Sequence, residues 1–332
     1  MTSSSIAARL VSVAAATLPA VTRARYREQW MADLRDADEA GVQRSGIVLG
    51  AFSFATSFVT RHLMGTEIRA SRSWLQLAIG LAVLAVPLWF GFVSGGLLNG
   101  TTVALRDNLD VYIQFMNSPL TVLFPVLVVF LSCLRLFQEL GHRFASNTLV
   151  RVRVESYVFA KLLVASGTSF LVFFLFAFVP FLVAFYLWPL WGNPSVDPSV
   201  YMMTTESALA DSFQRATFTS FLEQGPIMFG VVYSLWVAFG ASVYTGLGMA
   251  ALLLVKNRPL ALALPFVLFF GETAAAQIAG HPYASLLFSL FPFGYQQAPL
   301  LVGMAPTLVL AVLVAVIWVF IMRRVQFLES LA

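Results

Sequence analysis

The chain has 332 residues, of which 59% are hydrophobic and only 11% are charged, and its formal net charge is +4 at pH 7. Soluble domains carry about 25% charged residues, so this composition excludes an ordinary water-soluble domain and indicates a membrane protein. The basic residues follow the predicted topology, which favours anionic lipid headgroups over nucleic acid as their partner. The single cysteine, Cys133, lies in an apolar run and excludes an internal disulfide and a thiolate metal cluster.

Residues 1–73 are predicted to form a cytoplasmic prefix of amphipathic helices. The first apolar stretch has no basic region ahead of it, so it favours a short helix that ends before Pro19 over a signal peptide. A second, charged helix places Tyr26, Trp30 and Leu34 on one face at four-residue spacing. This face is expected to pack against the next helix or to lie on lipid headgroups.

A third apolar stretch of the prefix, 47–59, is long enough to suggest a span, but Arg44 and Arg61 flank it and serine and threonine interrupt it. A crossing here would place one basic cluster outside the membrane. The stretch is therefore predicted to be an amphipathic helix that lies on the inner leaflet or packs on the helix bundle.

Residues 74–332 contain six apolar runs that can each cross a hydrocarbon core of about 30 Å, which takes about 20 helical residues. The predicted spans are 74–98, 119–137, 157–187, 226–255, 259–278 and 300–322. The expected fold class is an all-α polytopic membrane protein with one six-helix transmembrane domain. Prolines inside four of these spans are expected to kink their helices: Pro87, Pro125, Pro180 and Pro265.

Lysine and arginine set the orientation of these spans. All of the 20 basic residues except Arg106 and Arg215 fall on one side of the membrane in this arrangement. Short loops rich in Lys and Arg stay in the cytoplasm, so the N- and C-termini are both predicted to be cytoplasmic. The protein is accordingly expected to be a multi-pass protein of the cell membrane.

Two connections form the predicted outer surface, residues 100–118 and the longer extracytoplasmic loop 191–225. Together they are net acidic by four charges. Asp197, followed by Pro198 and Ser199, is typical of a helix start and predicts a helix on the outer face. A solvated cap and a gate that releases substrate both fit this pattern.

The stretch 273–322 has 50 residues without Lys, Arg, Asp or Glu. As one straight helix it would measure about 75 Å, far more than a bilayer. Glycines and prolines are predicted to break it into short re-entrant half-helices before the last span: Gly280, Pro282, Pro292, Gly294 and Pro299. Irregular backbone survives at membrane depth only where protein or water satisfies its polar groups, so this connector indicates either a cavity or a buried link.

Two features inside the spans are candidates for function. Span 226–255 carries small residues at four-residue spacing, which predict close helix packing within the chain or a dimer seam: Ala238, Ser242, Gly246 and Ala250. Glu272 lies in the outer half of span 259–278. An ionisable residue in a membrane helix is energetically expensive, so Glu272 is a candidate for a translocation pathway, with contact to water or a polar partner as the alternative.

Catalytic and metal motifs are absent from the sequence. There is no G-x-x-x-x-G-K-S/T loop, so the chain cannot hold ATP phosphates in that way by itself. The three histidines match no zinc pattern, and there is no G-x-S-x-G elbow. Tyr157 and Lys161 match the Y-x-x-x-K spacing of short-chain dehydrogenases, but no glycine-rich nucleotide fingerprint accompanies them, so the match is attributed to chance. We therefore expect no enzyme activity, metal or cofactor in this chain.

The loop between the second and third spans carries a charged constellation. Glu139, Gly141 and Arg143 precede a second charged stretch with Arg151 and Arg153. Charged and apolar residues alternate on both sides of Gly141, which predicts a cytoplasmic helical hairpin that can dock on a soluble partner.

Residues 74–332 resemble the permeases of type 2 ABC exporters. The resemblance rests on six spans with both ends inside, on an E-x-G loop that runs into Y-V-x-A-K-L-L at 157–163, and on the broken connector before the last span. In that family the loop carries a coupling helix that contacts a separate ATP-binding subunit. The resemblance therefore implies that Glu139, Gly141 and Arg143 lie at this contact and that Arg151 and Arg153 flank it.

The resemblance has further implications for function. It implies a permease that works as a homodimer or a paired permease, with ATP-Mg bound only by the partner subunit. An amphipathic or hydrophobic substrate is expected because the spans are rich in Phe and poor in charge. The family's loop has a longer middle rich in serine and threonine, which here is reduced to 146–148. The prefix resembles a cytoplasmic segment of some actinobacterial membrane proteins, through Leu18-Pro19 and the run RYREQWMADL at 25–34.

Two other classes of function fit parts of the sequence. One is a non-transporting membrane anchor or sensor in which the prefix is the working part. The other is an intramembrane enzyme that acts on lipid, which would have to use Glu272 and His281 because the chain has no motif that pairs a nucleophile with a base.

Overall fold

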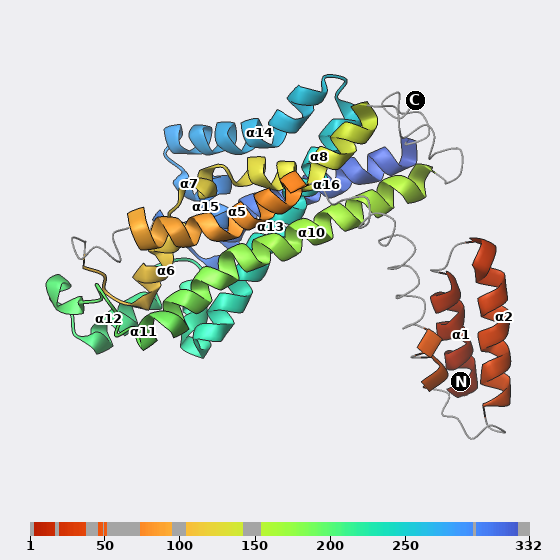
Figure 1. Cartoon of the computed structure of the whole chain (residues 1–332), viewed down its shortest axis with the longest axis horizontal. Coiled ribbons are helices and arrows are strands. Elements are labelled where there is room, and N and C mark those ends of the chain that lie inside the picture. The colour runs from red at the N-terminus through yellow and green to blue at the C-terminus, as the bar shows by residue number, and fades with distance from the viewer. Residues whose placement is uncertain are drawn as a thin grey trace. The chain divides into compact units, whose positions relative to one another are not determined.

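The computed structural model describes residues 3–16, 20–37, 46–48, 50–51, 74–94, 104–141, 154–294 and 297–324. These residues are helical with turns and contain no named strand; Leu105 and Val196 form one isolated bridge. The chain divides into two compact units, Met1–Ser73 and Trp74–Ala332 (Figure 1). The second unit begins at Trp74, the residue at which the first span is predicted to begin.

The first unit is built on two helices, α1 (Ser3–Ala16) and α2 (Ala20–Asp36), which pack against each other. α1 ends before Pro19, as predicted. Trp30 and Leu34 of α2 are buried, and the rings of Tyr26 and Trp30 lie 5.6 Å apart. The face predicted for α2 is therefore confirmed. Of the predicted helix 47–59, only 47, 48, 50 and 51 are among the described residues, and Ala51 joins this small core.

The second unit carries the membrane helices and the short helices that link them. Its described α-helices are α5 (Trp74–Trp89), α6 (Asn108–Met116), α7 (Pro119–Val122), α8 (Phe124–Gly141), α10 (Val154–Leu182), α11 (Trp188–Leu190), α12 (Thr205–Ser212), α13 (Pro226–Leu254), α14 (Arg258–Ile278), α15 (Leu286–Leu290) and α16 (Leu300–Arg324). The described residues also form the π-helices η2 (Phe90–Ser94) and η3 (Val183–Leu187) and the 3₁₀-helices η4 (Pro198–Tyr201), η5 (Thr219–Gln224), η6 (Pro282–Ala284) and η7 (Pro292–Gly294).

Four helical segments within the described residues are long and apolar enough to cross a membrane: Val154–Leu190, α13, α14 and α16. They correspond to the last four predicted spans. α14 and α16 expose many large apolar side chains, among them Val267, Phe270, Val309 and Val316. Exposed apolar surface of this extent marks a face that contacts lipid or protein. The chain is thus a helical protein with the helices of a membrane-embedded fold.

The first two predicted spans differ from the observed helices. Apolar helix continues from α5 through η2 to residue 94, and 95–98 lie outside the described residues. The predicted span 119–137 is interrupted at Leu123, between α7, which ends at Val122, and α8, which begins at Phe124. Pro125 is the second residue of α8, so the interruption lies in the turn before it, where proline removes a backbone donor and clashes with the preceding turn.

The other three prolines do lie inside helices. Pro87 in α5 and Pro180 in α10 are each followed three residues later by a π-helix, η2 and η3. Proline removes a backbone donor and clashes with the preceding turn, and a wider π-turn is one way in which a helix accommodates the resulting mismatch. Pro265 lies inside α14, and Pro306, which the sequence analysis did not single out, lies inside α16.

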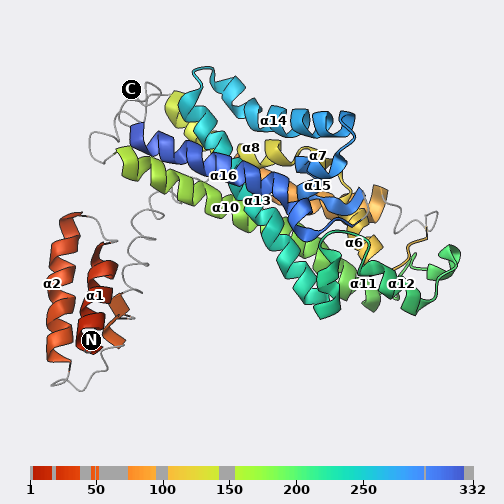
Figure 2. The same cartoon turned by 180° about the vertical axis from the view of Figure 1, so that it is seen from behind.

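α13 is the central helix of the second unit and contacts α8, α10, α14 and α16 (Figure 2). Its sequence is apolar or small on every side, which is the pattern of a helix buried all round. The ends of the unit differ: α6, α11 and α12 gather at one end, and the turn between α13 and α14 and the end of α16 lie at the other.

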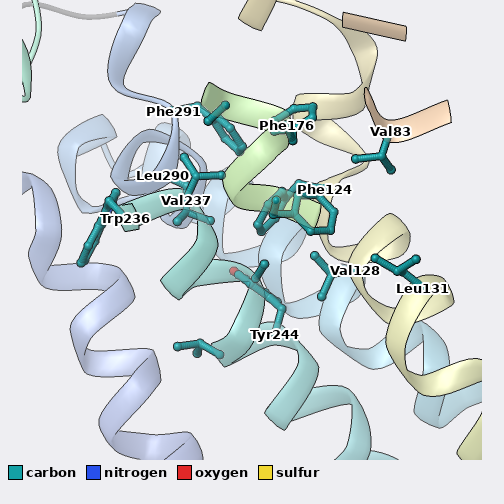
Figure 3. Packing of buried hydrophobic residues seen from close by; sticks show 14 of the residues in the cluster. Val83, Phe124, Val128, Leu131, Phe176, Trp236, Val237, Tyr244, Leu290 and Phe291 are labelled. Carbon is teal, nitrogen blue, oxygen red and sulfur yellow. The ribbon is translucent and has the colours of Figure 1, made fainter. Parts of the chain in front are cut away.

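An aromatic core fills the space around α13 (Figure 3). The Phe124 ring of α8 lies 4.9 Å from Phe173, 5.4 Å from Phe291 and 5.8 Å from Tyr244, measured between centroids. All three pairs meet edge to face, the arrangement that aromatic quadrupoles favour. Helices α8, α10 and α13 and the chain after α15 are therefore joined through one ring cluster.

Replacing Gly230 by Ala is expected to destabilise the second unit by about 1–3 kcal/mol, the usual range for overpacking a core. A Cβ at Gly230 of α13 would stand 2.3 Å from the ring of Phe181, which is fully buried in α10. Gly271→Ala is the matched control, because a Cβ there meets no atom within 4 Å. Thermal unfolding in mild detergent measures both variants. Equal melting temperatures for the two would contradict the close α10–α13 packing.

Candidate functional site

The connector between α14 and α16 is broken into η6, α15 and η7, as the sequence predicts. α15 is buried, with Leu286 4% and Leu290 0% exposed. Side chains of α13 satisfy its last carbonyls: the Tyr233 hydroxyl donates to the Leu290 oxygen at 2.9 Å, and the Trp236 Nε1–H donates to the Ser289 oxygen at 2.8 Å. Protein groups therefore hold this short backbone away from water, as irregular backbone at membrane depth requires.

Two neighbouring residues of α14 hold the other end of α15. The Leu286 N–H donates to Glu272 Oε2 at 2.8 Å, and the Leu287 N–H donates to Thr273 Oγ1 at 3.3 Å. The Ser285 hydroxyl oxygen accepts from the Phe288 N–H at 3.2 Å. The first N–H groups of a helix have no partner inside it, so these oxygens act as caps. Glu272 thus has the polar partner that the sequence analysis offered as an alternative to a pathway role.

A cavity of about 1000 Å³ lies between α14, η6, α15 and α16, and Glu272 forms part of its wall. His281 and Tyr283 are its other polar lining residues, and apolar side chains make up most of the rest. Val309 and Leu313 of α16 line it and are more than half exposed. The cavity therefore opens on the apolar face of α14 and α16. Both features that the connector predicted, a buried link and a cavity, are present side by side.

The lining of this cavity is typical of a ligand site. Its described lining residues include Glu272, His281 and Tyr283 and no Ser, Thr, Cys, Lys or Asp. A volume of this order suits a small or medium-sized ligand, and apolar walls with a few polar groups are typical of ligand sites.

At the other end of the unit, a cluster of charged residues joins α8 to α10. Glu139 Oε1 accepts from Lys161 Nζ at 2.7 Å and from Arg135 Nε at 2.9 Å, and its Oε2 accepts from the Tyr157 hydroxyl at 2.6 Å. Lys161 is only 7% exposed. Glu139 lies two residues beyond the predicted second span. Burial alone would raise its pKa, but the hydrogen bonds and charges of Lys161, Tyr157 and Arg135 hold the pKa below its ordinary value.

The predicted coupling residues are only partly within the described chain. Glu139 points into this cluster, and Gly141 is the last residue of α8. Arg143, Arg151 and Arg153 lie outside the described residues. The Y-x-x-x-K spacing of Tyr157 and Lys161 places both side chains on one side of α10, where they bind Glu139. That spacing is thus explained by a contact between helices.

The small-residue stripe of α13 packs inside the chain. Ala238 and Ala250 are buried, and the Ser242 hydroxyl lies 3.4 Å from the Ser166 oxygen of α10. A Cβ at Gly246 would stand 3.1 Å from Val314 of α16. The Trp318 indole of α16 also donates to the Gly246 oxygen at 2.9 Å. These contacts show that the small residues of α13 pack against α10 and α16 of the same chain, which is the first of the two predicted uses.

Sequence reasoning missed an ion network in the outer connections, which it described as a solvated cap or a gate. Arg215 donates to Asp110 at 2.6 Å, to Asp211 at 2.7 Å and to Asp107 at 2.9 Å. Arg106 contacts Asp110 and Asp211 at 2.9 and 3.3 Å. Burial disfavours the charge of Arg215, but Asp107, Asp110 and Asp211 outweigh it and raise its pKa. The available signal was that Arg106 and Arg215 are the only basic residues in these acidic connections.

A second group that the sequence did not reveal is a chain of buried hydroxyls among α8, α10 and α13. The Thr245 hydroxyl oxygen lies within hydrogen-bond distance of two serine hydroxyls, 2.8 Å from Ser169 Oγ and 3.3 Å from Ser132 Oγ. Hydrogen bonds between membrane helices are worth about 0.6 kcal/mol on average. This group therefore orients helices.

The predicted helix start at Asp197 is confirmed, because the Asp197 carboxylate accepts from the Ser199 N–H at the start of η4.

Comparisons of the chain with protein-family models, curated proteins and solved structures returned no match.

Proposed function

We propose that this chain is the transmembrane permease subunit of an ATP-driven type 2 ABC exporter in the cell membrane. It would have six spans, with α5 and α8 as the first two, and both termini in the cytoplasm. A separate ATP-binding subunit would supply ATP-Mg, and two permease chains would work as a pair. The substrate would be amphipathic or hydrophobic, in keeping with apolar cavity walls.

The observation that carries this proposal is the Glu139 cluster. The resemblance to these permeases rests on residues from both sides of the loop 142–153, namely Glu139 before it and Tyr157 and Lys161 after it. The Tyr157 hydroxyl and Lys161 Nζ both donate to the Glu139 carboxylate, at 2.6 and 2.7 Å respectively. A cross-link of this kind joins α8 rigidly to α10, so a force on the loop would move both helices together.

The rest of the proposed mechanism follows from how the helices pack. α10 packs along α13, and α13 contacts α16. A push on the loop by an ATP-binding subunit would therefore rock the bundle through its central helix. Closure and opening of the partner would alternate access to the cavity beside α16 between the two sides of the membrane.

The first test is co-purification of the tagged chain in mild detergent with mass spectrometry and an ATPase assay. We expect an ATP-binding subunit in the wild-type sample. The double variant Arg151→Glu, Arg153→Glu should reduce its recovery at least about tenfold, because reversing charges at an interface costs several kcal/mol. These residues are preferable to Glu139, whose replacement would also break the link between α8 and α10.

The double variant Lys256→Glu, Arg258→Glu is the matched control, since it makes the same charge change on the same predicted side of the membrane and away from the loop. It should leave recovery unchanged. If the wild-type chain purifies without any ATPase, under conditions that preserve complexes of this kind, the proposed ATP-driven mechanism is contradicted. The compact first unit would then favour the membrane anchor or sensor.

A further inference from the structure

The carboxylate of Glu272 has no cationic partner within the described chain. It accepts one hydrogen bond, from the Leu286 N–H, and forms no ion pair. Residues 259–322 contain no Lys or Arg, so α14 beyond its first residue, Arg258, the connector and the membrane part of α16 offer no permanent cation. Arg106 and Arg215 are both bound to aspartates of the outer network. An ionised carboxylate in apolar surroundings is costly unless a positive group pairs with it.

The surroundings of Glu272 divide into a closed side and an open side. On the closed side, the carboxylate accepts from the Leu286 N–H at the start of the buried helix α15. On the open side lies the cavity, with Leu268, Val309 and Leu313 along its apolar wall. A positive group can therefore approach the carboxylate from the cavity, and an apolar chain attached to it would find apolar walls.

We propose that this cavity binds a cationic amphiphile, whose ammonium group pairs with Glu272 and whose tail lies along Leu268, Val309 and Leu313. This inference deepens the proposed function by naming the class of substrate, and it rests on that function only for the claim that the ligand is moved. A second copy of the chain fits less well. If two copies met through this face about a twofold axis, neither would bring a Lys or Arg to the other's Glu272, because 259–322 has none.

The test is photo-crosslinking in lipid nanodiscs with two diazirine probes of equal tail length, one with a trimethylammonium head and one with a neutral hydroxyl head. Mass spectrometry maps the labelled peptides. We expect the cationic probe to label residues 260–313 about tenfold more than the neutral probe, the discrimination of one charge-assisted contact. Glu272→Gln should bring this ratio to about one, because glutamine keeps an oxygen for the Leu286 N–H and loses only the charge.

Thr273→Ala separates charge from the capping of α15. It removes the neighbouring cap, which lies outside the cavity wall, and keeps the carboxylate, so the tenfold ratio should persist. Equal labelling by both probes in the wild type would overturn the inference, and so would a loss in Thr273→Ala as large as that in Glu272→Gln. A disulfide-linked dimer of Val309→Cys that excludes the probe would overturn it as well, by assigning the groove to a second copy.

Labelling requires neither ATP nor a partner subunit. A failure here would therefore leave the co-purification result standing, and a failure of co-purification would leave the ligand site standing. The two claims are tested independently.

Discussion

Replacing Arg215 by Met is expected to loosen the outer connections by about 3–4 kcal/mol, the range for breaking a buried ion pair by removing one partner. Arg215 is 11% exposed and bonds to three aspartates, from the start of α6 and the end of α12. Without it, Asp110 and Asp211 would keep only Arg106, and Asp107 would lose its ion pair with Arg215. The measurement is hydrogen exchange of backbone amides in α6 and α12, which should become more than about 100-fold faster.

Arg106→Met is the control for this prediction. It removes the same charge from the same network, but Arg106 has two aspartate partners and its side chain is 29% exposed. Its replacement should cost about 1 kcal/mol, because exposed ion pairs contribute little. If Arg106→Met accelerates exchange as much as Arg215→Met, the centre of the network is not at Arg215. Such a result would support a loosely solvated cap.

Replacing Glu139 by Gln is expected to lower the free energy of unfolding by about 3 kcal/mol, because it breaks the buried Lys161–Glu139 ion pair by removing one partner. The measurement is unfolding in detergent with increasing dodecyl sulfate, followed by tryptophan fluorescence. Glu206→Gln is the matched control, since Glu206 is exposed in α12. Its effect should stay within about 0.5 kcal/mol.

A double-mutant cycle isolates the pair itself. The variant Glu139→Gln, Lys161→Met removes both charges, so it should recover about 2 kcal/mol relative to Glu139→Gln alone. Additive losses would show that the two side chains contribute separately and would contradict a direct link between α8 and α10.

The dependence of this contribution on pH has a definite sign. Lys161, Tyr157 and Arg135 hold the pKa of Glu139 below its ordinary value of 4.5 in the folded chain. A carboxyl whose pKa is lowered by folding stabilises the folded state at pH values above its unfolded pKa. The stabilisation is therefore complete above about pH 5 and is lost as the pH falls through the folded pKa. Glutamine does not titrate, so the difference in the free energy of unfolding between wild type and Glu139→Gln should shrink as the pH falls through the folded pKa.

Several features of this fold follow from local sequence alone. The last four spans were predictable because each is a long apolar run bounded by charged residues or proline, and length and hydropathy are sufficient for that inference. The break between α14 and α16 was predictable because Gly280, Pro282 and Pro292 interrupt a run too long for one helix. The buried face of α2 followed from the four-residue spacing of Trp30 and Leu34.

Other features were misjudged because two local signals competed. The run 119–137 is apolar enough for one helix, but Pro125 fits best in a first turn, so the helix begins anew at Phe124. A hydropathy profile does not reveal this break before Phe124, because proline is only moderately polar on hydropathy scales. Pro306 was overlooked, although it lies inside α16 as Pro265 lies inside α14.

By itself, the sequence determined that this is a helical membrane chain, where its longest helices lie, and that a broken connector precedes the last one. These properties depend on composition and on spacing within a few turns. Tertiary structure alone decided that Glu139 binds Lys161, that Arg215 gathers three aspartates and that Glu272 faces a cavity without a cation. Apart from the pair of Arg215 and Asp211, which are four residues apart, these contacts join residues 14 to 108 positions apart. The pairing of such distant residues depends on how whole helices pack, which no local pattern encodes.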